Sequence, residues 1–319
     1  MIINTVILLL GLGLLAWSAD RFVYGAAALA RNVGLPPLII GLTIVAMGSS
    51  APEAMVAASA AMDGRLDTAV GNVVGSNIAN ITLILGVTAL IRPLLVGSSA
   101  LVREMPLMLG ASVLAGYLMN DLQLSRLDGL LLALAFAVVM AILVIAALRN
   151  RDSTDPLIQE SDDEIPIGVP NSHALGWLAL GMILLPLAAE LMVSNAVIIA
   201  KHFGLSDLVI GLTIIAVGTS LPELAASLAG LAKNEDDLVI GNVVGSNLFN
   251  ILAVLAIPAL IAPGALDPAA AGRDFYFMLA TSLAPLLLLL LKRRRIIGRW
   301  AGATLLSAFI LYQYSLFAA

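Results

Sequence analysis

The stretch Gly41-Leu-Thr-Ile-Val-Ala-Met-Gly-Ser-Ser-Ala-Pro-Glu53 occurs twice in this chain, because Gly211-Leu-Thr-Ile-Ile-Ala-Val-Gly-Thr-Ser-Leu-Pro-Glu223 repeats it 170 residues later. Aligned without gaps, 18 of the 40 positions from 41 to 80 are identical to those from 211 to 250. Chance does not produce this agreement, so the two halves of the chain are copies of one unit.

A second motif follows the first in each copy. Gly71-Asn-Val-Val-Gly-Ser-Asn77 is identical to residues 241–247, and Asn80 matches Asn250 at the same offset. Two spaced motifs in both halves indicate that the repeat includes functional polar residues as well as apolar ones.

The composition defines the environment of this repeat. Of the 319 residues, 61% are hydrophobic and 12% are charged, whereas a soluble domain is about 25% charged. So few ionic groups indicate a protein of the lipid bilayer. Cysteine is absent and only two histidines occur, which excludes disulfides, thiolate metal sites and thiol nucleophiles. The net charge of −5 argues against a nucleic-acid partner.

Apolar runs bounded by charge, Gly and Pro predict ten membrane-spanning segments, each of roughly 20 residues or more. They lie near 2–19, 33–62, 68–91, 104–120, 127–148, 174–200, 206–232, 238–262, 275–291 and 296–318. Of the nine loops between these spans, the first, third, fifth, seventh and ninth hold 12 of the 16 Lys and Arg residues. Because cytoplasmic loops are enriched in these residues, both termini are predicted to lie outside.

Five spans in each half make the second half enter the membrane from the opposite side. The fold class predicted is therefore all-α and polytopic, with ten transmembrane helices in two inverted five-helix repeats, at 1–148 and 174–319. Inverted repeats commonly build secondary transporters, with the binding site near the midplane. Residues 149–173, rich in Asp and Glu, are predicted to form a solvated cytoplasmic linker. A regulatory calcium sensor there would lack the EF-hand ligand spacing.

Glu53 and Glu223 lie inside long apolar segments, where an ionisable side chain is costly and generally functional. The alternative is a structural hydrogen bond or ion pair between helices, but no basic residue lies near either glutamate in sequence. Pro52 and Pro222 precede them and cannot donate a backbone hydrogen bond. Each segment is therefore predicted to run as two half-helices, with backbone carbonyls released to bind a cation.

Oxygen-bearing side chains surround these positions. At the predicted breaks, hydroxyl groups come from Ser49, Ser50, Thr219 and Ser220. The second motif and the asparagine that follows it supply Ser76, Asn77, Asn80, Ser246, Asn247 and Asn250. Such oxygen-rich ligands suit hard cations such as Na⁺, Ca²⁺ or Mg²⁺, with Ca²⁺ favoured over Mg²⁺ because it accepts flexible coordination. The alternative for the serines and asparagines is hydrogen bonding that packs helices together. Asp20 and Glu190 form a further repeated pair, which would line an access path or stabilise helix ends.

The paired G-[ST]-S-x-P-E and G-N-x-x-G-S-N motifs resemble the two alpha-repeats of the cation/calcium exchanger superfamily, and the layout is most similar to its bacterial calcium/sodium antiporter branch. The resemblance implies Na⁺/Ca²⁺ antiport by alternating access in a bacterial inner membrane, with three sodium sites and one calcium site. It also implies that Na⁺ and Ca²⁺ are substrates, that no cofactor is needed, and that a defined set of residues binds the ions. That set comprises Glu53, Glu223, Ala46, Ser49, Ser50, Ser76, Asn80, Ala216, Thr219, Ser220 and Ser246, with Asn250 as the counterpart of Asn80.

Several functions stay open beside this expectation. An exchanger of the same fold coupled to H⁺ or K⁺ is the nearest alternative, although Asn250, which is Asp in certain relatives, favours independence of K⁺. A passive cation channel is disfavoured by inverted repeats with broken helices. An intramembrane enzyme is disfavoured because no nucleophile-and-base constellation accompanies the glutamates.

Overall fold

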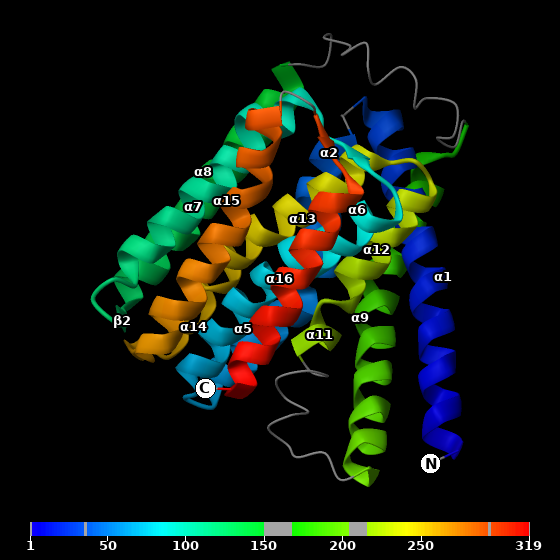
Figure 1. The fold of residues 1–319 in the computed structure, drawn as a ribbon. Helices are drawn as coiled ribbons and strands as arrows, with labels where there is room; N and C mark the ends of the chain where they lie inside the picture. The colour runs from blue at the N-terminus through cyan, green and yellow to red at the C-terminus, as the bar shows by residue number, and fades with distance from the viewer. Residues whose placement is uncertain (1, 35–36, 150–167, 204–215, 293–294, 319) are drawn as a thin grey trace.

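The computed structural model describes residues 2–34, 37–149, 168–203, 216–292 and 295–318. It is built almost entirely of helices (Figure 1). The first half comprises α1 (Ile2–Val33), α2 (Pro37–Ile40), the π-helical turn η1 (Gly41–Val45), α3 (Ala46–Ser49), α4 (Ala51–Met62), α5 (Leu66–Ala79), η2 (Asn80–Ile84), α6 (Leu85–Ile91), β1 (Leu94–Leu95), η3 (Ala100–Glu104), α7 (Met105–Leu118), β2 (Gln123–Leu124) and α8 (Arg126–Arg149).

The second half repeats this order wherever the structure describes it. It comprises α9 (Asn171–His202), α11 (Ala216–Thr219), α12 (Leu221–Ala232), α13 (Asp236–Phe249), η6 (Asn250–Val254), α14 (Ala256–Ile261), β3 (Gly264–Ala265), η7 (Ala270–Asp274), α15 (Phe275–Lys292), β4 (Ile296–Ile297) and α16 (Arg299–Ala318). The π-helical turns η2 and η6, and likewise η3 and η7, lie 170 residues apart. The duplication therefore extends to local irregularities of the helices.

Helices α1 and α9 are repeat-equivalent and pack side by side in opposite directions (Figure 1). Gly25 of α1 lies against Ala174 and Leu178 near the start of α9, whereas Gly11 lies against Met192 near its end. At about 1.5 Å per residue, the 32-residue α1 is about 48 Å long, well beyond the ~30 Å hydrocarbon layer. Helix α1 therefore extends beyond the predicted first span of 2–19 and continues through Arg21 and Arg31.

The centre of the molecule is formed by the two helices that contain the second motif. In the most apolar 18-residue stretch of each candidate span, 72% of the residues are buried in Leu66–Ile91 and in Asp236–Ile261. In the other candidate spans this share is at most 39%. Close packing explains part of this difference: a Cβ on Gly245 of α13 would lie 2.5 Å from the carbonyl oxygen of Leu42. The motif-bearing helices are thus shielded from lipid by the rest of the chain.

Two short antiparallel strand pairs connect the halves. Strand β1 of the first half pairs with β4 of the second, and β2 of the first half pairs with β3 of the second. Since β1 and β3 are repeat-equivalent, the two pairings are reciprocal. Each half therefore contributes one strand to each pair.

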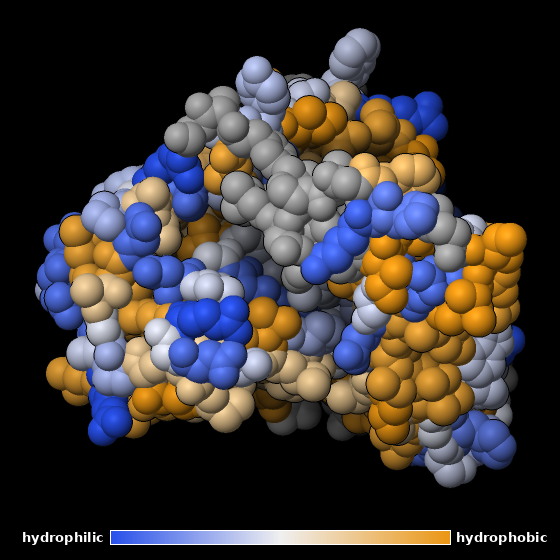
Figure 2. Space-filling model, turned by 90° about the horizontal axis from the view of Figure 1, so that it is seen from below, coloured by the Kyte–Doolittle hydropathy of each residue, from blue (hydrophilic) through white to orange (hydrophobic). Residues whose placement is uncertain are grey.

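The outer surface is apolar. Figure 2 shows hydrophobic side chains over the flank where α1 and α9 lie. Among the described residues, seven helices are long and apolar enough to cross a membrane. The described parts of the predicted spans 33–62 and 206–232 consist of shorter helices such as α4 and α12, so they fall outside that set. The predicted span 296–318, which contains the 20-residue α16, is not among the seven either. The chain is accordingly a multi-pass membrane protein.

Candidate cation site

The two helix breaks place both glutamates at the start of a helix. Ser50 has φ −84° and ψ 12°, and Ser220 has φ −90° and ψ 7°, so each serine interrupts the helix between its two pieces. The predicted half-helices are confirmed at both positions. Residues Gly211–Ile215, which precede the second break, lie outside the described residues.

The prolines begin the second half-helix. Pro52 is the second residue of α4 and Pro222 the second of α12, where a backbone N–H would have no acceptor within the helix. Glu53 and Glu223 follow at the third position, near the positive end of the helix dipole. The local sequence thus favours a negative charge at the point where the backbone is interrupted.

Each glutamate accepts a hydrogen bond from the break of the other repeat. The hydroxyl of Ser50 donates to Oε1 of Glu223 over 2.7 Å, and the hydroxyl of Ser220 donates to Oε1 of Glu53 over 3.3 Å. Ser76 also donates to Oε1 of Glu53, over 3.4 Å. These reciprocal bonds bring Glu53, Glu223, Ser50, Ser220 and Ser76 into one cluster formed by both repeats.

The second carboxylate oxygens are unsatisfied. Glu53 and Glu223 are at most 1% exposed, and Oε2 of each has no hydrogen-bond partner among the described residues. Neither side chain belongs to an ion pair in the described part of the chain. A buried carboxylate without such compensation is strongly disfavoured, so these two oxygens are available to a cation.

Asn72 and Asn242 hold the backbone of the glutamates. Asn72 donates to the carbonyl of Glu53 over 3.1 Å, and Asn242 donates to the carbonyl of Glu223 over 3.2 Å. Asn242 also bonds Ser227 at 3.0 Å and accepts from Ser49 at 3.2 Å. Neither asparagine was predicted as a site residue, although each is the second residue of the repeated G-N-x-x-G-S-N motif.

Asparagines of the two second motifs are hydrogen-bonded across the repeats. Asn80 donates to Oδ1 of Asn247 over 2.9 Å, and Asn77 donates to the backbone carbonyl of Asn247 over 3.5 Å. Asn250 is fully buried, and neither its Oδ1 nor its Nδ2 has a partner among the described residues. Asn80 and Asn250 also begin the π-helical turns η2 and η6, a kind of irregularity frequent at functional sites.

The remaining predicted residues lie around this cluster. Ser246 is buried, and its hydroxyl has no partner among the described residues. The carbonyl of Ala46 accepts from the amide of Ser50 and the hydroxyl of Ser49, so its oxygen is already engaged. Thr219 is half-buried at the end of α11, and Ala216 begins that helix. Asp20 is not part of the cluster, because it pairs with Lys233 at 2.6 Å.

The donor set is composed of oxygen. Two carboxylates are surrounded by serine hydroxyls and asparagine amides, and no group of three or more His, Asp or Glu residues occurs in the described part of the chain. Hydroxyl, carbonyl and carboxylate oxygens are ligands for hard cations, and two acids with many neutral oxygens match flexible coordination better than a transition-metal site.

Comparison with known proteins agrees with this chemistry. The family described as "Sodium/calcium exchanger protein" matches residues 3–145 and 173–318. The chain belongs to this family. It is 54% identical over 318 residues to the protein named CaxA of Alkalimonas amylolytica, covering 99% of each chain. It is 45% identical over 318 residues to the inner membrane protein YrbG of Escherichia coli, covering 99% of this chain and 98% of that protein.

A solved structure supports the fold of this sodium/calcium exchanger family member. The structure of the sodium-calcium exchanger NCX_Mj superimposes with a TM-score of 0.85 at 32% sequence identity, covering 99% of each chain. The resemblance to cation/calcium exchangers is therefore confirmed, and the family and fold are those of transporters rather than enzymes.

Proposed function

We propose that this protein exchanges Na⁺ for Ca²⁺ across the inner membrane by alternating access, at a midplane cluster of cation sites built on Glu53 and Glu223. One observation carries the proposal: two fully buried carboxylates, each bonded to a serine of the opposite repeat, present an unsatisfied Oε2. A bound cation supplies the missing compensation. The family, and the inner-membrane relative, support the transport role and the location.

The proposed architecture is ten membrane spans in two inverted repeats. It is supported by the antiparallel packing of α1 on α9 and by the reciprocal pairs β1–β4 and β2–β3. The repeats are 1–148 and 174–319, joined by the acidic linker 149–173 on the cytoplasmic side, with both termini outside. In this arrangement the two halves form alternate walls of the site, which allows access from each side in turn.

The charges of the two glutamates connect the site to antiport. Together they contribute −2, which one Ca²⁺ neutralises, whereas the three Na⁺ expected from the family resemblance leave +1. Both loads need the same carboxylate oxygens, so calcium and sodium exclude one another. Exchange of three Na⁺ for one Ca²⁺ moves one net charge, and a membrane potential acts on it with ~2.3 kcal/mol per 100 mV.

The test is calcium flux in proteoliposomes. We expect calcium uptake to require an outward sodium gradient. Each cycle would carry one net positive charge out of the vesicle, so uptake should increase when a potassium ionophore holds the vesicle interior positive. The gradients of K⁺ and H⁺ are imposed separately in parallel vesicles. Uptake driven by H⁺ or K⁺ without sodium would contradict Na⁺ coupling, and calcium uptake that needs no counter-ion would indicate a channel.

A further inference from the structure

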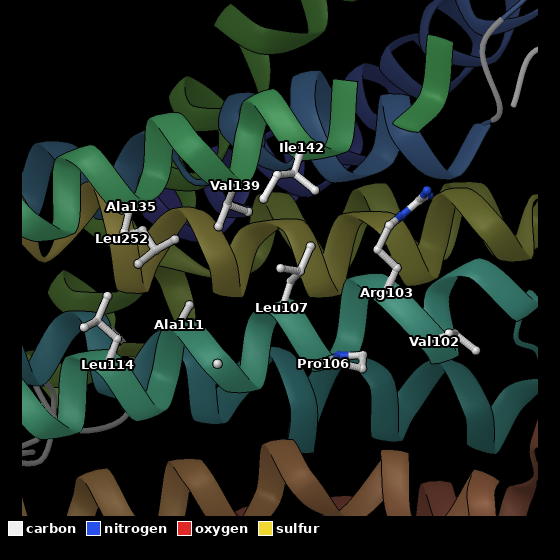
Figure 3. Close-up of a pocket in the computed structure, with 11 residues that line it drawn as sticks. Val102, Arg103, Pro106, Leu107, Ala111, Leu114, Ala135, Val139, Ile142 and Leu252 are labelled. Carbon is white, nitrogen blue, oxygen red and sulfur yellow. The ribbon is translucent and has the colours of Figure 1, made fainter. Parts of the chain in front are cut away.

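A groove with a volume of about 440 Å³ runs between α7 and α8, and none of its lining residues belongs to the candidate cation site. Figure 3 shows it from the side, with Arg103 towards one end and Leu114 and Ala135 towards the other. Leu107, Val139 and Ile142 contribute to its apolar walls, and Leu252 of the second half, which is fully buried, also lines it. Apart from Arg103, every residue of the lining is apolar.

The length of the groove matches one leaflet of a bilayer. Arg103 and Leu114 are separated by eleven residues of helix, which correspond to about 16 Å at ~1.5 Å per residue. Half of a ~30 Å hydrocarbon layer is about 15 Å. Gly110 lies along this path, and a Cβ built on it would meet nothing within 4 Å, so the space beside it is wide enough for another chain.

Bulkier residues stand at two equivalent positions of the second half. Leu107 corresponds to Phe277 at the repeat offset of 170, and Gly110 corresponds to Ala280. Phe277 stacks on Tyr312 of α16, with ring centroids 4.7 Å apart and planes 12° apart. The lining of the groove thus differs from its repeat equivalent at these two positions.

Arg103 is fixed at its end of the groove. Its Nε and Nη2 donate to Oε1 of Glu104, which is fully buried behind it. Because a guanidinium carries five N–H donors, this pair leaves donors for a phosphate, which Arg binds in a forked geometry. Arg103 also belongs to the loops rich in Lys and Arg, which are expected at the cytoplasmic surface.

We propose that this groove binds one anionic glycerophospholipid of the cytoplasmic leaflet. Its acyl chain lies along α7 and α8 as far as Leu114, and its phosphate contacts the guanidinium of Arg103. The site is separate from the cation site, and binding requires no transport, so this proposal stands or fails independently of the exchange function.

The experiment is lipid titration of the full-length protein in detergent, with bound lipids counted by native mass spectrometry. The probes are phosphatidylglycerol and diacylglycerol with identical acyl chains, because diacylglycerol lacks the phosphate that would contact Arg103. We expect the wild-type protein to retain one phosphatidylglycerol with about tenfold preference, the effect of one charged hydrogen-bonded contact. Arg103→Gln should bring that preference close to one. Equal retention of both lipids by the wild-type protein would overturn the proposal.

A second variant tests the groove without altering the ion pair. Gly110→Leu places a side chain in the open space and should reduce retention of both lipids about tenfold or more. Gly13→Leu, at a position on α1 where a Cβ also meets nothing within 4 Å, adds the same volume outside the groove and should retain the lipid as the wild-type protein does. Unchanged lipid retention in the Gly110 variant would show that the lipid binds elsewhere.

Discussion

Replacing either site glutamate by glutamine should abolish the stabilisation of the folded protein by calcium. Glu53→Gln and Glu223→Gln keep the size of the side chain and an oxygen that can accept from Ser220 or Ser50. The substitution lowers the charge of the site from −2 to −1, so a bound Ca²⁺ would leave a buried +1. We expect each single variant to lose calcium binding and exchange while still folding.

The magnitude follows from the buried oxygens. In the wild-type protein without cations, each Oε2 is buried without a partner among the described residues, a state that costs ~1–3 kcal/mol per group and more when charged. Calcium at about 100 times its dissociation constant stabilises the folded state by ~2.7 kcal/mol. In calcium, the wild-type protein should therefore be more stable than either variant. Without calcium, each variant should be at least as stable as the wild-type protein.

Glu104→Gln provides the matched control. Glu104 is likewise a fully buried glutamate with an unpartnered Oε2, but it pairs with Arg103 and lies outside the cation site. Its loss should lower stability with and without calcium and leave the increment from calcium intact. Thermal unfolding followed by tryptophan fluorescence, with calcium flux in parallel, measures both. A Glu53 or Glu223 variant that keeps the wild-type calcium increment would refute the assignment.

Three further outcomes test other parts of the site. Asn242→Ala removes hydrogen bonds to the backbone of Glu223 and to two serines and should lower calcium affinity about tenfold or more. Asn72→Ala removes a single hydrogen bond and should lower calcium affinity less. Equal effects of the two substitutions in flux assays would contradict this ranking. Asn250→Asp adds a titratable group and should make exchange more sensitive to protons, which a pH profile in vesicles checks. Gly245→Ala should destabilise by ~1–3 kcal/mol, because its Cβ would overlap the backbone of Leu42, whereas Gly110→Ala should be neutral in the same unfolding assay.

The features that could be predicted from sequence depend on local rules. Proline is favoured in the first turn of a helix, so Pro52 and Pro222 indicate the breaks before Glu53 and Glu223. Residue type alone does not decide this, because Pro186 and Pro285 lie inside α9 and α15. The scarcity of charge made both glutamates recognisable in apolar segments. The repeat also predicted that equivalent elements would recur, as η2 and η6 do, although their π-helical geometry has no known signature in the sequence.

The features that could not be predicted depend on contacts between the halves. The first helix extends to Val33 because α9 packs along it. The hydropathy of neighbouring residues carries no information about a helix about 150 residues further along the chain. The roles of Asn72 and Asn242 were missed for a similar reason: both are ordinary polar residues in a motif until a backbone carbonyl from another helix is placed beside them.

The crossed hydrogen bonds give a physical reason why the site belongs to both halves. If Ser50 bonded Glu53 within its own repeat, one half could form a carboxylate site alone, and movement of the other half would leave it unchanged. Instead Ser50 donates to Glu223 and Ser220 donates to Glu53. A cation that binds both carboxylates therefore fixes the two helix breaks relative to each other, and its departure leaves two buried negative charges that repel. In the exchange that we propose, movement between the halves is thus coupled to occupancy of the site, which is the condition that an exchanger must meet.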